Sequence, residues 1–351
     1  MVLLKATATA TMLGRRPRPV TPLEGVDVLL ADLDGVVYQG PHAIPHAVES
    51  LNRAVDEGIR VGYITNNASR SDSVVAAHLT DFGLTVAPSD VVTSPQAAMR
   101  LLAAAVPAGS LILVVGGEGL TTEIERAGFR VTRAASDGPA AVVQGFSPDV
   151  GWKDLAQAAL ALARDRSGNG IPWVATNTDW TIPVEGGIAP GNGTLVSAVH
   201  TAVGILPQVA GKPETPIFTE AVERFGASSP LFIGDRLDTD ILGAQRAKMR
   251  SVHVLTGIDR AKQLLAADAS SRPDFLLDDL RQLFEPYPIA VTRNDVTTVA
   301  GARVRLRNGR VEILADGDRP IDLLRAACAA IWGSGLPIYA LDVPPRLYSE
   351  R

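Results

Sequence analysis

The chain has 351 residues, of which 46% are hydrophobic and 20% are charged, and its formal net charge is −5. This length predicts two or three domains, and the acidic balance gives no reason to expect nucleic acid or an anionic membrane as a partner. The single cysteine, Cys328, excludes an intrachain disulfide. No uncharged apolar run reaches the ~18 residues that span a bilayer. Residues 1–20 carry arginines but no apolar signal core, so we expect a flexible leader and a cytoplasmic protein.

Short apolar runs that alternate with amphipathic stretches predict a parallel sheet covered by helices. In chain order, strands are expected at 26–31 and 60–64, with a helix at 44–57 between them that ends at Gly58. Further strands are expected at 230–233 and 250–255. We assign residues 21–95 and 208–285 to one α/β core, whose loops at the carboxyl ends of the strands are where ligands should bind.

The middle of the chain, residues 96–207, reads as a separate α/β module with its own strands at 111–115, 140–143 and 172–175. The pattern changes again from residue 286. An alternating segment at 304–314 surrounds Asn308-Gly309 and predicts a β-hairpin. A helix at 321–331 and a strand at 338–341 complete a small C-terminal α/β domain, residues 286–351.

Four loops that follow apolar runs carry polar residues of the kinds that phosphoryl transfer requires. In Asp32-Leu33-Asp34-Gly35 two carboxylates flank one apolar residue, so one can attack phosphorus while the other moves a proton. Thr65-Asn66-Asn67 offers hydroxyl and amide donors to phosphate oxygens. Lys212, between Gly211 and Pro213, offers a compact positive charge.

The fourth loop, residues 234–240, holds Asp235, Asp238 and Asp240, oxygen ligands that suit a hard cation. Each loop alone has an ordinary interpretation: an Asp-x-Asp turn, a helix cap, a surface turn or a solvated acidic cluster. Their shared position after strands and their order along the chain favour one catalytic site.

With these four motifs in this order, residues 26–283 resemble the haloacid dehalogenase superfamily. The resemblance implies a Rossmann-like hydrolase core in which Asp32 is the nucleophile that forms an aspartyl-phosphate. It implies that Asp34 is the general acid and base. Thr65, Asn66 and Lys212 would bind or support the phosphoryl group. Asp32, Asp34 (through its carbonyl) and Asp235 would hold Mg²⁺, with Asp240 as a supporting partner.

The inserted module resembles the α/β cap of the class IIA branch, which includes phosphatases of p-nitrophenyl phosphate, phosphoglycolate and glycerol 3-phosphate. The segment Ala175-Thr176-Asn177-Thr178-Asp179 resembles its cap loop, although Thr178 stands where proline is frequent. Asn177 and Asp179 are therefore expected to set substrate specificity. The branch also makes a homodimer an expectation.

Within that branch the chain resembles an actinobacterial type of glycerol 3-phosphate phosphatase, in which the region corresponding to residues 286–351 looks like a shortened acetyltransferase of the GNAT type. It has about 65 residues, too few for a whole acetyltransferase, and no Arg/Gln-x-x-Gly-x-Gly/Ala segment to hold a coenzyme A pyrophosphate. A structural role is favoured over acyl-CoA binding.

The expected function is a Mg²⁺-dependent phosphatase of a small phosphomonoester, with glycerol 3-phosphate favoured by resemblance. Phosphoglycolate, a nucleotide or pyridoxal phosphate stay open as substrates. A phosphomutase or a non-catalytic binding protein stays open as another class.

Overall fold

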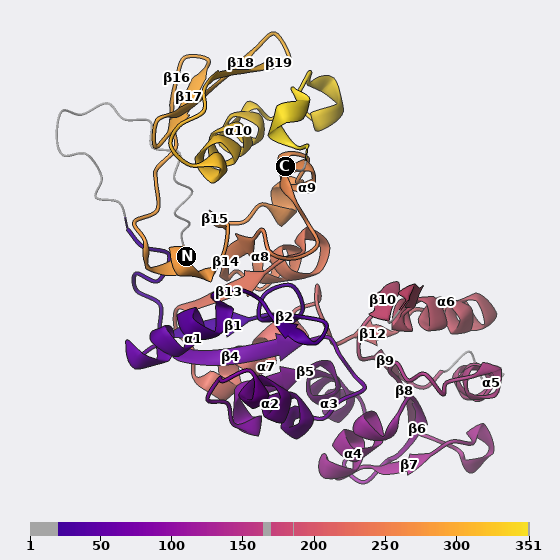
Figure 1. The fold of residues 1–351 in the computed structure, drawn as a ribbon. Coiled ribbons are helices and arrows are strands. Elements are labelled where there is room, and N and C mark those ends of the chain that lie inside the picture. The colour runs from indigo at the N-terminus through magenta and orange to yellow at the C-terminus, as the bar shows by residue number, and fades with distance from the viewer. Residues whose placement is uncertain (1–19, 164–169, 185, 350–351) are drawn as a thin grey trace.

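The computed structural model describes residues 20–163, 170–184 and 186–349. The expected leader, residues 1–20, lies outside the described residues except for residue 20. Figure 1 shows three parts: a central core, a second α/β part at its lower right, and a small C-terminal part above it.

The core is a six-stranded sheet in the order β15-β14-β13-β1-β4-β5, and every neighbouring pair is parallel. Its strands are β1 (Val28–Ala31), β4 (Arg60–Thr65), β5 (Val91–Thr93), β13 (Pro230–Gly234), β14 (Arg250–Val254) and β15 (Phe275–Leu277). The predicted parallel α/β core is confirmed. β1 lies inside the sheet, so the loop that follows it is flanked by the loops after β13 and β4.

Hydrophobic side chains fill both faces of this sheet because its strands are apolar on both sides. Leu29 and Ala31 of β1 lie in one buried cluster and Val28 and Leu30 in the other. The first face is covered by α1 (Ala47–Asp56) and α2 (Asp72–Asp81). The second is covered by α3 (Ser94–Ala105) and α7 (Pro216–Phe225), while α8 (Leu242–Arg246) and α9 (Ala261–Leu265) follow β13 and β14.

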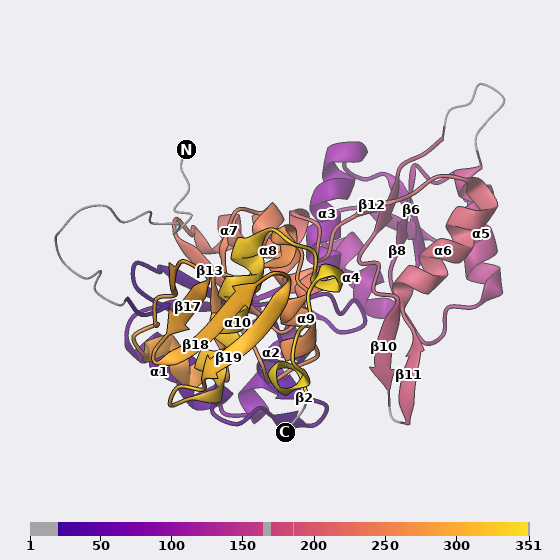
Figure 2. The ribbon, with the colours of Figure 1, turned by 90° about the horizontal axis from the view of Figure 1, so that it is seen from above.

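The inserted module contains a second parallel sheet in the order β12-β9-β8-β6-β7. Its strands are β6 (Leu111–Val115), β7 (Arg130–Thr132), β8 (Ala141–Gln144), β9 (Trp173–Ala175) and β12 (Gln208–Val209). Its helices are α4 (Glu118–Arg126), α5 (Trp152–Leu162) and α6 (Asn192–Val203). A hairpin of β10 (Thr181–Val184) and β11 (Gly187–Pro190) projects from it, as Figure 2 shows.

Helix α3 joins the two sheets. Ala97, Ala98 and Leu102 of α3 share one hydrophobic cluster with Leu30 of the core sheet and Ile112 of the inserted sheet. The predicted domain boundary at residue 96 therefore falls inside a helix that packs on both parts, and the division at that residue stays a prediction.

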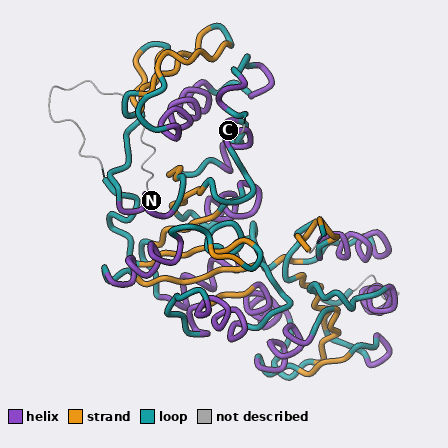
Figure 3. The backbone as a smooth tube through the Cα atoms, viewed as in Figure 1, coloured by secondary structure: helices purple, strands orange, loops and turns teal. Residues whose placement is uncertain are grey.

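The C-terminal part is an antiparallel sheet in the order β16-β17-β18-β19 with one long helix, α10 (Pro320–Ser334), on one face (Figures 1 and 3). Its strands are β16 (Val291–Arg293), β17 (Val296–Val299), β18 (Ala302–Arg307) and β19 (Arg310–Ala315). The predicted hairpin is confirmed: Asn308 and Gly309 join β18 to β19 with positive φ angles of 51° and 76°.

The predicted strand at 338–341 is wrong. Residues Ile338–Ala340 form a single turn of 3₁₀-helix, in which the N–H of Ala340 donates to the carbonyl of Pro337 at 2.9 Å. Tyr339 is 90% exposed, so this segment has no buried face to place on a sheet. The chain pairs with β19 immediately after this segment, at an isolated bridge between Arg310 and Asp342.

None of the helices in the described residues combines the length and the apolar character needed to cross a membrane.

Candidate active site

Three of the four predicted loops meet at the carboxyl edge of the core sheet. Asp32 follows β1, Thr65 ends β4, and Asp235 follows β13, so three adjacent strands deliver them to one place. The N–H of Asp32 donates to the carbonyl of Ile233 at 2.9 Å, which extends the pairing of β1 with β13 and fixes the start of the loop. Asp32, Thr65 and Asp235 are all buried.

Lys212 comes from a different part of the fold, the connection between β12 of the inserted sheet and α7 of the core. Its Nζ lies 2.7 Å from Asp32 Oδ1 and 2.6 Å from Asp240 Oδ1. The Lys212 side chain is 4% exposed, so the ammonium forms two buried ion pairs. Such pairs fix geometry strongly, because removing one partner leaves an uncompensated buried charge.

Both carboxylate oxygens of Asp240 are hydrogen-bonded. Its second carboxylate oxygen, Oδ2, accepts from the backbone N–H groups of Asp235 and Arg236, each at 3.1 Å. Because Oδ1 already binds Lys212, both oxygens of Asp240 are engaged with protein donors. This geometry makes Asp240 the residue that orients Lys212, rather than a carboxylate free to bind a cation directly.

Asp235 is only half satisfied. Its Oδ2 accepts from the N–H of Ile258 at 2.6 Å, whereas its buried Oδ1 has no hydrogen-bond partner among the described residues. Gly35 and Gly257 lie so close to this carboxylate that a Cβ atom at either position would collide with it. The loop at 256–259 thus encloses Asp235 without using its inner oxygen.

The distribution of charge explains the direction of each pKa shift. Burial raises the pKa of Asp32 well above its ordinary value, although the neighbouring Lys212 opposes this. Burial and the nearby Asp240 raise the pKa of Asp235 to about 7. Burial would lower the pKa of Lys212, but the carboxylates of Asp240 and Asp32 outweigh it and raise that pKa. Crowded negative charge in a poorly solvated site is the common cause.

A divalent cation fits this arrangement. Oxygen atoms of Asp32 and Asp235 lie within 4.8 Å of each other, and an oxygen of Asp240, already bonded to protein donors, lies equally near. The unpartnered Oδ1 of Asp235 and the raised pKa of Asp32 and Asp235 both indicate a position where a positive charge would stabilise the carboxylates. Hard cations such as Mg²⁺ prefer oxygen ligands of this kind.

Asp34 differs from its neighbour in exposure. It lies at the solvent-exposed mouth of the site, and Gly35, with φ of 80°, turns the chain directly after it. The turn is closed by the N–H of Gly35, which donates to the carbonyl of Tyr38 at 2.8 Å. Partial desolvation raises the pKa of Asp34, while Lys212 opposes that shift. The loop therefore separates one buried carboxylate from one that substrate and water can reach.

A loop of the inserted module closes over this site. Asn66 Nδ2 donates to Asp179 Oδ1 at 3.1 Å and to the carbonyl of Lys212 at 3.0 Å, and its Oδ1 accepts from the N–H of Lys212 at 2.8 Å. Asn177 Nδ2 donates to the carbonyl of Asn66 at 2.7 Å. Burial raises the pKa of Asp179, although its hydrogen bond from Asn66 opposes this.

All nine predicted site residues are therefore brought into one connected region: Asp32, Asp34, Thr65, Asn66, Asn177, Asp179, Lys212, Asp235 and Asp240. Their individual roles stay predictions. Two contributors are not among the residues predicted from the sequence: the loop at 256–259 and Ser94, whose Oγ donates to the carbonyl of Asn66 at 2.8 Å. Gly257 follows an apolar strand in the same way as the four motifs, so that signal could have found the loop.

Comparison with known proteins supports this grouping. A family profile described as haloacid dehalogenase-like hydrolase matches residues 29–130, and a related HAD-hydrolase-like profile matches residues 209–283. D-glycerol 3-phosphate phosphatase from Mycobacterium tuberculosis is 42% identical over 87% of this chain and 86% of its own length. An acid sugar phosphatase from Staphylococcus aureus is 32% identical over 72% of this chain and 95% of its own.

Solved structures agree with the sequence relatives. A glycerol phosphate phosphatase from M. tuberculosis, in complex with magnesium, superposes with a TM-score of 0.82 at 41% identity, covering 92% of this chain and 95% of that one. A p-nitrophenyl phosphatase from Archaeoglobus fulgidus gives a TM-score of 0.67 at 26% identity, covering 74% and 98%. From these matches, the chain belongs to the haloacid dehalogenase-like hydrolase family.

Proposed function

We propose that this protein is a Mg²⁺-dependent phosphatase that hydrolyses D-glycerol 3-phosphate to glycerol and phosphate through an aspartyl-phosphate on Asp32. The observation that carries the proposal is the buried contact of 2.7 Å between Asp32 and Lys212, beside the unpartnered oxygen of Asp235. A nucleophile, a fixed positive charge and a cation position are the three parts that phosphoryl transfer to a carboxylate needs.

Asp32 attacks phosphorus and the ester oxygen leaves. Attack on a phosphate dianion by a carboxylate is opposed by like charge, so positive charge must be in place beforehand. Lys212 supplies it, and Asp240 keeps the Lys212 ammonium directed at Asp32. Thr65, buried at the end of β4, provides a hydroxyl for the transferred phosphoryl group. When bound by Asp32, Asp235 and the carbonyl of Asp34, Mg²⁺ adds charge neutralisation and orients the phosphate oxygens.

Asp34 gives its proton to the leaving alkoxide and then accepts one from the water that hydrolyses the aspartyl-phosphate. The raised pKa of Asp34 supports this role, since a group that alternates between acid and base works best when its pKa lies nearer the working pH. Its exposed position supports it too, because leaving group and water both arrive from the solvent side.

Asn177 and Asp179 set specificity from the cap loop. Asp179 is partly buried and directed to the active site through its bond with Asn66, so its carboxylate suits a substrate hydroxyl. The 42% identical D-glycerol 3-phosphate phosphatase favours a small polyol phosphate. Phosphoglycolate, a nucleotide and pyridoxal phosphate are the alternatives, because the catalytic loops recognise only a phosphomonoester.

The test is a panel of these phosphomonoesters assayed with Mg²⁺ and with EDTA. We expect Mg²⁺-dependent release of inorganic phosphate, fastest from glycerol 3-phosphate and absent in Asp32→Asn. A phosphomutase would transfer phosphate to a second substrate without stoichiometric release of inorganic phosphate. A non-catalytic binding protein would show no turnover with any ester.

The C-terminal part is proposed to be a shortened GNAT-like domain with a structural role. Its helix α10 shares one hydrophobic cluster with Leu264 and Leu276 of the core. Arg325, buried in α10, donates through Nε to the carbonyl of Leu276 at 3.0 Å, which ties the helix to the edge strand β15.

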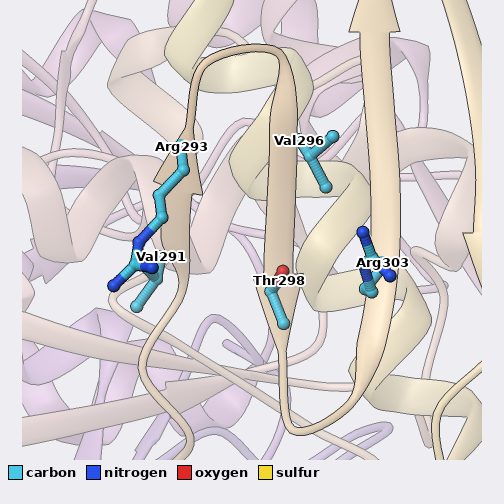
Figure 4. A pocket seen from close by; sticks show the side chains of 5 residues that line it. All are labelled: Val291, Arg293, Val296, Thr298 and Arg303. Atoms are coloured by element: carbon cyan, nitrogen blue, oxygen red, sulfur yellow. The ribbon is translucent and has the colours of Figure 1, made fainter.

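The outer face of its sheet carries a hollow of about 430 Å³, lined by Val291, Arg293, Val296, Thr298 and Arg303 from β16, β17 and β18 (Figure 4). We assign no ligand to it. Calorimetric titration with acetyl-CoA tests the structural role: we expect no heat of binding, and saturable binding would overturn the proposal.

A homodimer formed through the inserted module is also proposed, in a cytoplasmic protein. Trp180 and Ile188 on or beside the β10–β11 hairpin are 66% and 73% exposed, as is Trp152 of α5 at 80%. Exposed apolar side chains of this size favour a contact surface. Light scattering of the wild type and of Ile188→Glu tests this; a monomer in both would contradict it.

A further inference from the structure

The start of helix α6 is hydrogen-bonded to the loop at 177–180, which carries Asp179. The N–H groups of the glycines at 191 and 193 donate to the carbonyls of Trp180 at 2.8 Å and Asp179 at 2.9 Å. Between them, Asn192 Nδ2 donates to the carbonyl of Asn177 at 2.7 Å. Three consecutive residues at the start of α6 therefore hold three carbonyls of one short loop.

The two glycines allow this contact because they have no side chains. A Cβ at Gly191 would collide with the carbonyl of Asp179, and a Cβ at Gly193 with the carbonyl of Thr178. The helix start and the loop thus meet backbone to backbone. Asn192 is the side chain of this segment that reaches into the loop, and it is completely buried.

The same loop is held from the core side. Asn177 Nδ2 donates to the carbonyl of Asn66 at 2.7 Å, and the side chain of Asn66 binds both Asp179 and the backbone of Lys212. Asn192, Asn177 and Asn66 are thus linked in series, each side-chain amide donating to a backbone carbonyl of the next residue. The last of them, Asn66, donates to the backbone of Lys212, whose ammonium contacts Asp32.

The side chain of Asn192 is poorly suited to a purely stabilising role. Its Oδ1 is buried and has no protein partner among the described residues. A buried acceptor without a partner opposes folding. The Nδ2 group, by contrast, has a short bond to the Asn177 carbonyl. The contact that the side chain does make is the one to the loop.

We propose that Asn192 is a positioning residue that fixes how far Asp179 reaches into the active site. It thereby sets the preference for phosphomonoesters with a hydroxyl near the ester over aryl phosphates that have none. This inference rests on the proposed role of Asp179 as the acceptor of a substrate hydroxyl.

The experiment compares glycerol 3-phosphate with p-nitrophenyl phosphate, which has no hydroxyl for Asp179. In Asn192→Ala we expect KM for glycerol 3-phosphate to rise about tenfold, the loss typical of one misplaced charged hydrogen bond. The kcat for this ester and the kcat/KM for p-nitrophenyl phosphate should fall far less. A merely structural role would lower kcat/KM for both substrates together, so equal losses of kcat/KM would overturn the proposal.

Two further variants make the result specific. Asn192→Asp keeps the size of the side chain but replaces its Nδ2 donor by an acceptor, so it should lose selectivity as Asn192→Ala does. Full wild-type selectivity in this variant would contradict the proposal. Thr201→Val, which removes an exposed hydroxyl bonded within α6, should retain wild-type selectivity.

Asp179→Ala separates this inference from the proposed function beneath it. If Asp179→Ala abolishes the preference for glycerol 3-phosphate while both Asn192 variants retain it, the positioning role alone is refuted. If Asp179→Ala retains the preference, the specificity role of Asp179 is refuted and the inference falls with it.

Discussion

Replacing Lys212 with methionine removes the central positive charge of the site and keeps the length of the side chain. In the wild type its ammonium lies 2.7 Å from Asp32 and 2.6 Å from Asp240, both buried. Removing one partner of a buried ion pair costs about 3–5 kcal/mol. Each kcal/mol lowers the melting temperature of a domain of this size by about 2–4 °C, so we expect a loss of roughly 10 °C without metal.

Magnesium should reverse part of this loss. Without Lys212, carboxylates of Asp32, Asp235 and Asp240 remain within 4.8 Å of one another with no neighbouring ammonium. The ammonium repels a cation bound beside it, and one unit-charge repulsion at 4 Å is worth about 4 kcal/mol at an effective dielectric constant of 20, so its removal should tighten Mg²⁺ binding. A ligand that binds only the folded state stabilises it by RT ln(1 + [L]/Kd), about 1.4 kcal/mol for every tenfold gain in affinity at saturation.

The assay is thermal unfolding at pH 8 and constant ionic strength, with EDTA or with increasing MgCl₂. The rise in melting temperature with Mg²⁺ should be larger in Lys212→Met than in the wild type, although phosphatase activity is lost. Lys153→Met, an exposed position in α5, is the control and should behave as the wild type. A variant as stable as the wild type without metal, or one with no larger response to Mg²⁺, would refute this account of the charges.

Three other predictions concern single groups. Asp34→Asn should lower kcat for glycerol 3-phosphate by about 10²-fold or more, while the Mg²⁺-induced rise in melting temperature stays at its wild-type size; full activity would exclude Asp34 as the acid. Gly257→Ala should displace the Asp235 carboxylate and raise the Kd for Mg²⁺ in a calorimetric titration, whereas Gly151→Ala, where an added Cβ meets no neighbour, should not. Burial lowers the pKa of His253 to about 4, so the unfolded state binds more protons than the native state between that pH and the ordinary histidine pKa of about 6.5. Stability should therefore fall as pH drops through this window, by up to about 1.4 kcal/mol for each pH unit; His253→Gln should flatten the dependence of melting temperature on pH there, and an unchanged slope would contradict the assignment.

Local patterns in the sequence were sufficient to locate the strands and the loops that follow them. Apolar runs such as 230–233 and 111–115 are local signals, and both became strands within one residue of the expected bounds. The four motifs could be found in the same way, since each is a polar segment directly after such a run. The family resemblance, which rests on these motifs, implies the roles expected for Asp32, Lys212 and Asp235.

The contacts among these groups, by contrast, follow only from the folded arrangement. Asp240 lies 28 residues from Lys212 along the chain, and only the folded arrangement shows that its oxygens are used by Lys212 and two backbone N–H groups. The bond between Asn66 and Asp179 spans 113 residues. The strand expected at 338–341 became a 3₁₀ turn with no buried residue, and the chain pairs with the edge of β19 just beyond it, at Asp342. Local patterns fix which residues can form an element, whereas partners across such separations depend on strand order and crossover connections, which no short stretch of sequence contains.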